Sequence, residues 1–206
     1  PRPCPNKDFM NPSHATFPRW FRCLAGSQAR KSLAESGADP DTFTLMLAAS
    51  GGPRWLGLVG IDQALRGYLT ARRTPIPTLG ASSGAWRLAA LAADEDGQTY
   101  RELIHEYIEQ RYEGRPTPGE VSDVCRDYLS RLFTPKRIES ILSHPQFQLN
   151  FTTALMAREF PTKWNTLASV VLATLYNAVD RRLLGLHFRR AVFSTLPHPQ
   201  NSPLAT

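Results

Sequence analysis

The chain has 206 residues, 42% hydrophobic and 20% charged, which suffices for one substantial core and is too short for two large domains. The net charge of +6 favours anionic partners such as lipid headgroups or phosphates, but no basic run or aromatic-interleaved motif supports nucleic-acid binding. Three widely spaced cysteines indicate neither a disulfide framework nor a metal site, and they favour a reducing cytoplasm.

The first predicted elements follow an irregular N-terminal lead-in, residues 1–40, in which prolines and polar residues alternate. Residues 41–206 are expected to form one domain. Its first element is an apolar run at 43–49, bounded by turn residues, which predicts a strand buried on both faces. A helix is predicted at 54–71, with glycines that would allow close approach to a sheet.

The next elements continue the alternation of strand and helix. A second short strand is predicted at 76–81 and a helix at 84–93. Apolar spacing further predicts helices at 98–112, 120–132 and 165–184 and strands at 147–156 and 187–193. Strand, helix, strand, helix in this order predicts an α/β fold with a mainly parallel sheet.

A serine stands between small residues where the second strand meets its helix. The sequence Gly-Ala-Ser-Ser-Gly at 80–84 places Ser82 at a sharp strand-to-helix turn, with Gly80 and Gly84 giving the crowded backbone room. The N–H groups and positive dipole end of the following helix favour negative charge at the same point. Ser82 is therefore the predicted nucleophile of an acyl-transfer reaction.

A second glycine turn lies one strand-helix unit upstream, at Ser-Gly-Gly-Pro-Arg, residues 50–54. Gly51 and Gly52 would let backbone N–H groups approach an oxyanion, with Arg54 as a further donor. A nucleotide-phosphate cradle is the alternative interpretation. It is disfavoured because the dinucleotide and P-loop motifs are absent and Pro53 removes one donor.

These two motifs, with their order and spacing, resemble those of the patatin-like phospholipase family over about residues 43–93. Residues 48–56 resemble its glycine-rich oxyanion loop, and residues 79–87 resemble its nucleophile elbow. The resemblance implies a three-layer α/β/α sandwich, a Ser-Asp dyad without a catalytic histidine, and hydrolysis of lipid or phospholipid esters. It implies no metal and no organic cofactor.

The catalytic aspartate of that family stands in an Asp-Gly-Gly or Asp-Gly-Ala motif, which this sequence lacks. Asp96 is rejected because the helix after Ser82 would carry it roughly 18 Å away. Asp180, beside two arginines, is interpreted as a surface ion-pair residue. We therefore expect the chain to be a C-terminally incomplete piece whose catalytic base lies outside it and which is inactive by itself.

Two other interpretations remain open at the level of sequence. A Ser-Asp-His esterase would recruit Asp180 with His187 or His198. An inactive hydrolase fold would serve as a lipid-surface or protein-interaction module.

The expected location is the cytoplasm, with peripheral attachment to an anionic membrane surface as a further expectation. No apolar run approaches the ~18 residues of a membrane span, and the first residues lack the apolar core of a signal peptide. The sequence predicts no particular oligomeric state.

Overall fold

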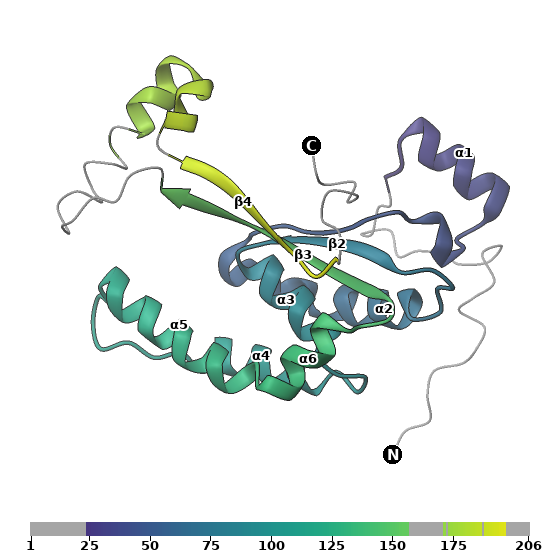
Figure 1. The fold of residues 1–206 in the computed structure, drawn as a ribbon, viewed down its shortest axis with the longest axis horizontal. Coiled ribbons are helices and arrows are strands. Elements are labelled where there is room, and N and C mark those ends of the chain that lie inside the picture. The colour runs from purple at the N-terminus through teal and green to yellow at the C-terminus, as the bar shows by residue number, and fades with distance from the viewer. Residues whose placement is uncertain (1–23, 157–170, 172, 187, 197–206) are drawn as a thin grey trace.

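A four-stranded open sheet in the order β1-β2-β3-β4 is the centre of the computed structural model, which describes residues 24–156, 171, 173–186 and 188–196 (Figure 1). The strands are β1 (Met46–Ala48), β2 (Ile76–Ala81), β3 (Phe147–Met156) and β4 (Phe188–Ser194). The first three run parallel, and β4 runs antiparallel to β3. The predicted α/β class with a mainly parallel sheet is confirmed.

Six α-helices and three short 3₁₀ helices connect and flank the strands in the described part of the chain. They are α1 (Ser27–Ser36), η2 (Pro40–Thr42), η3 (Gly52–Leu58), α2 (Val59–Leu69), α3 (Ser83–Ala92), α4 (Gln98–Glu109), α5 (Pro118–Leu132), α6 (Pro135–Leu142) and η4 (Arg181–Leu186). Residues 173–179 are also helical. The middle of the chain is helical, as the apolar spacing predicted.

The helices α2 to α6 gather on one side of the sheet (Figure 1). Successive right-handed crossovers that advance in the same direction fall on the same face, so the order β1-β2-β3 accounts for this arrangement. On the covered face, Ala48 and Leu88 belong to one core cluster. On the opposite face Leu47 is 67% exposed, so within the described residues the sheet has one helical layer.

Strands β3 and β4 extend beyond the end of β2 (Figure 1). Ala81, the last residue of β2, pairs with Thr152, whereas β3 continues to Met156 and pairs there with β4. We call this projecting part, residues 153–156 and 188–191, the β3–β4 ribbon. It leaves a step in the sheet where β2 ends.

Three predicted elements differ from the structure. The run at 43–49 forms a strand only at Met46–Ala48, and it is exposed on one face because β1 lies at the sheet edge. The helix expected at 54–71 begins instead with η3, because Gly57 disfavours a regular α-helical turn. A Cβ added at Gly57 or Gly60 would meet nothing within 4 Å, so neither glycine is needed for close packing on the sheet.

Two helices were not predicted. Helix α1 lies inside the lead-in that was expected to be irregular, and it buries none of its residues. Residues 1–23 of that lead-in lie outside the described residues. Helix α6 begins after Thr134, whose hydroxyl accepts from the Arg137 N–H, with Pro135 in its first turn.

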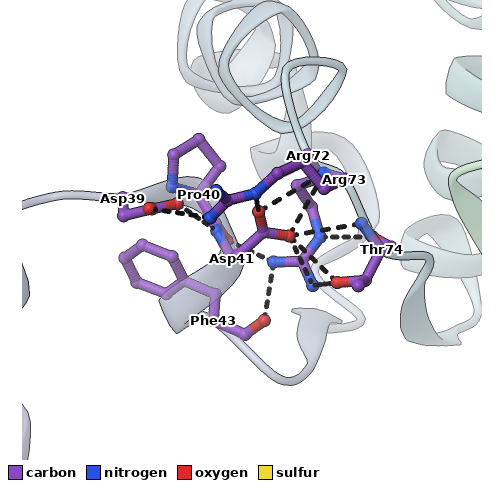
Figure 2. A network of polar contacts seen from close by, with 7 residues as sticks. All are labelled: Asp39, Pro40, Asp41, Phe43, Arg72, Arg73 and Thr74. Atoms are coloured by element: carbon purple, nitrogen blue, oxygen red, sulfur yellow. Dashed lines mark hydrogen bonds and ion pairs between the residues drawn. The ribbon is translucent and has the colours of Figure 1, made fainter.

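A polar network fastens the segment before β1 to the loop before β2 (Figure 2). Asp41 accepts hydrogen bonds from the side chain of Arg73, at 2.7 Å, and from the backbone and hydroxyl of Thr74. The buried Arg72 donates to the carbonyls of Pro40 and Phe43. This network holds the entry to β1 beside the entry to β2, which positions the loops at the opposite ends of both strands.

Candidate functional site

Ser82 occupies the turn between the end of β2 and the start of α3. Its backbone has φ 52° and ψ −128°, and it is the only non-glycine residue with positive φ among those the structure describes. Its carbonyl accepts from the Ala85 N–H at 2.9 Å, which closes the first turn of α3. An L-residue adopts this region only under strain of ~1–3 kcal/mol, and such conformations concentrate at functional sites.

The two glycines around Ser82 are required by contact. A Cβ at Gly80 would lie 2.6 Å from the Ala85 backbone, and one at Gly84 would lie 2.1 Å from the Ala48 carbonyl oxygen. Gly84 therefore lets the first turn of α3 touch the end of β1. The predicted elbow is thus a close-packed turn of strand, helix and neighbouring strand.

The glycine turn at 50–54 follows β1 at the same edge of the sheet. Ala48 pairs with Gly80 in the parallel register, so both strands end side by side. Gly52 has φ 52°, a conformation that favours glycine. Within the described residues, the N–H groups of Gly51 and Gly52 have no hydrogen-bond acceptor. Two N–H groups without an acceptor among the described residues therefore stand in the loop next to the turn of Ser82.

The residues after the glycine turn differ in role. Arg54 is exposed and forms no ion pair with any described residue. Trp55 is buried and packs edge-to-face on Tyr100 and Tyr107 of α4. Trp55 therefore anchors η3, as expected of a core aromatic, and leaves Arg54 on the surface.

A buried ion pair joins the helices that follow the two motifs. Arg87 of α3 donates to both oxygens of Asp62 in α2, at 2.7 and 2.6 Å, and the Tyr100 hydroxyl donates to the same carboxylate. Burial alone would lower the pKa of Arg87, but the bonds and charge of Asp62 raise it above its ordinary value. Burial and Asp62 together raise the pKa of Tyr100. The cluster fixes α3 to α2, and Arg87 has the structural role expected of it.

This cluster was not predicted, although the sequence contains a signal for it. Asp62 lies three residues from both Val59 and Leu65 in α2, and Arg87 interrupts the otherwise apolar α3. A charge of each sign on the packed faces of consecutive helices indicates a pair.

A cavity of about 570 Å³ opens beside Ser82 at the step in the sheet. Its described lining is Ala81, Ser82, Thr152, Thr153, Ala154, Phe188, Arg189 and Arg190. The sequence predicted a strand at 187–193 but no role for its two arginines. Because the parallel strands β2 and β3 end at one edge, an antiparallel strand returning from that edge brings its first residues to the site.

No carboxylate or imidazole is among the described residues that line this cavity. Asp96 lies beyond α3, at the opposite end of that helix from Ser82, which agrees with its rejection as the base. Asp180 accepts from the backbone N–H of Arg182 and forms no ion pair with Arg181, Arg182 or any other described residue, so the ion pair predicted for it is not seen in the described part of the chain. His187 and His198 lie outside the residues whose side chains the structure describes.

The described residues contain no cluster of three or more His, Cys, Asp or Glu side chains placed to hold a metal ion. None of their helices combines the length and apolarity required to cross a bilayer.

No family model matches this sequence, and neither a curated protein nor a solved structure matches it.

Proposed function

We propose that this chain carries the nucleophile of a patatin-like serine acyl hydrolase that cleaves lipid or phospholipid carboxylic esters. The observation that carries the proposal is the turn at Ser82. Ser82 holds a strained conformation that glycine would adopt more easily, between two glycines where an added Cβ would clash with backbone atoms. Beside it lies a loop with two N–H groups that have no acceptor among the described residues.

In the proposed reaction, Ser82 Oγ attacks the ester carbonyl carbon. The carbonyl oxygen becomes an oxyanion that accepts from the N–H groups of Gly51 and Gly52, while the positive end of α3 favours the developing charge. The bond to the alcohol then breaks, which leaves an acyl group on Ser82, and water hydrolyses the acyl-enzyme. No step requires a metal or an organic cofactor.

The proton of the Ser82 hydroxyl must pass to a base. The family resemblance favours an aspartate, and we assign this role to no described residue because the described lining of the cavity holds none. Arg54 is proposed to stay on the protein surface next to the glycine turn, where its exposed guanidinium helps to attract anionic lipid. A cytoplasmic enzyme acting at an anionic membrane surface fits these assignments.

The test is covalent labelling with a neutral alkyl fluorophosphonate, read by intact mass and peptide mapping. We expect one adduct on Ser82 when the protein includes its catalytic base, none in the Ser82→Ala variant of the same protein, and an unchanged adduct in Ser122→Ala, which alters an exposed serine of α5 far from the glycine turn in sequence. A chelator should leave labelling unchanged. Labelling that persists in Ser82→Ala would overturn the proposal.

A second candidate function is a non-catalytic module that binds a lipid surface. The lack of a carboxylate or imidazole among the described cavity residues favours it. This candidate predicts binding to vesicles of anionic phospholipid without any adduct on the wild-type chain. The same labelling experiment therefore separates the two functions.

A further inference from the structure

The cavity beside Ser82 combines a small volume with two cationic side chains. At about 570 Å³ it has the size of a small-ligand site, and Arg189 and Arg190 of β4 line it together with Ser82. Ser82 and the two arginines therefore face the same space.

Strand alternation distinguishes the two arginines. Ala154 pairs with Arg190 across the ribbon, and successive residues of a strand point to opposite faces. Thr152, Ala154, Phe188 and Arg190 therefore share one face, which is also the face of the last residue of β2, the pairing partner of Thr152. Arg189 points to the other face. Arg190 thus shares its face of the sheet with most of the strand residues that line the cavity.

The charge of Arg190 has no counterion in the described structure. Arg189 and Arg190 are exposed and form no ion pair with a described residue, and no Asp or Glu is among the described lining of the cavity. The exposed Arg181 and Arg182 of η4, which packs against β4, add further positive charge at this end of the molecule. Such a site attracts anions rather than neutral molecules.

We infer that Arg190, assisted by the Thr152 hydroxyl, binds an anionic oxygen group of the substrate, a phosphate or a carboxylate, close to the ester that Ser82 attacks. The planar guanidinium offers two parallel N–H donors to such a group, and the hydroxyl adds a third. The inference rests on the proposed function. It adds a substrate class, esters with a negatively charged group near the scissile bond, and the residue that selects it.

The experiment measures binding of ethers, which contain no ester and cannot react with Ser82. The ligands are the hexyl ethers of glycerol, of glycerol phosphate and of glyceric acid, titrated calorimetrically at about 0.15 M ionic strength into the full wild-type chain, Arg190→Gln and Arg181→Gln. The two variants lose the same charge, but Arg181 of η4 is not among the described residues that line the cavity. The tighter of the two anionic ethers identifies the source of the anion as phosphate or carboxylate.

We expect Arg190→Gln to weaken binding of the tighter anionic ether by about 10- to 100-fold, the effect of losing a charge-assisted hydrogen bond. Binding of the neutral glycerol ether should change by less than about twofold, and Arg181→Gln should weaken anion binding by less than about threefold, since a charge outside the cavity acts only through screened long-range attraction. Equal affinity of the wild type for neutral and anionic ethers, or equal losses in both variants, would overturn the inference. Failure of the hydrolase proposal would appear separately, as missing fluorophosphonate labelling.

Discussion

The backbone of Ser82 gives this position an energetic signature that can be measured without any substrate. Ser82→Ala and Ser82→Gly both remove the hydroxyl, but only glycine relieves the positive φ of 52°. Relief of ~1–3 kcal/mol of strain outweighs the ~0.5–1 kcal/mol entropic cost of glycine. We expect the Gly variant to unfold at higher urea than the Ala variant, with a free energy of unfolding about 1 kcal/mol larger. Equal stability would show that the turn is unstrained.

The sequence could identify some residues of the site but not others. Glycine and serine types at fixed spacing identify the elbow and the glycine turn, because the backbone conformations they need exclude larger residues. Arg190 could not be assigned a role, because its place beside Ser82 depends on the register of β4 against β3. A short apolar run does not specify register with a distant strand.

The close packing of α3 against the end of β1 depends on Gly84. A Cβ there would lie 2.1 Å from a backbone oxygen that cannot move without shifting the strand. We expect Gly84→Ala to lower the free energy of unfolding by about 3 kcal/mol, the upper range for overpacking, and to abolish Ser82 labelling. Urea denaturation and intact mass measure the two effects.

Gly60→Ala is the matched control for this substitution. Gly60 lies in α2 with nothing within 4 Å of an added Cβ. Alanine is favoured over glycine inside a helix by up to ~1 kcal/mol, so this variant should be slightly more stable and label normally. A loss of stability as large as that of Gly84→Ala would contradict the steric explanation.

Elements with a strong period were predictable, and those without one were not. Strand β2 and helices α3, α4 and α5 bury regular apolar positions, so their existence followed from spacing. Helix α1 buries no residue and has no such stripe. Helix α6 has apolar residues at helical spacing, Ile138, Ile141 and Leu142, but its eight residues are too few for this spacing to identify a helix without the cap at Thr134 and Pro135.

For the whole molecule, the network of Figure 2 predicts part of the acid sensitivity. The hydrogen bond from the Arg73 side chain, helped by Thr74, lowers the pKa of Asp41 from 3.8 to about 2. Because the folded pKa is depressed, the stabilisation is complete above the unfolded value, near pH 4, and is lost as pH falls through about 2. Asp41→Asn should therefore lose less stability than the wild type between pH 5 and about 2.

Thermal unfolding at a series of pH values measures this difference. Asp123→Asn, which removes an exposed carboxylate paired with Arg126 on α5, is the control and should follow the wild-type acid limb. Parallel acid limbs in all three proteins would mean that the network around Asp41 does not contribute to the pH dependence.

The family resemblance implies a second helical layer on the other face of the sheet, but the two motifs alone cannot predict that layer. Two local motifs within residues 43–93 predict a strand-helix repeat, and consecutive strand order then places its helices on one face. Coverage of the other face depends on segments whose placement those motifs do not determine. On that face Leu47, in the edge strand β1, is exposed.

The strain at Ser82 also bears on mutational drift. Serine codons that begin with AG become glycine codons by a single base change, and glycine fits a backbone with φ 52° better than serine does. A chain with no use for the hydroxyl would gain stability from that change and lose nothing. A serine at a position where glycine would be more stable is therefore what we expect if the side chain at position 82 is under selection.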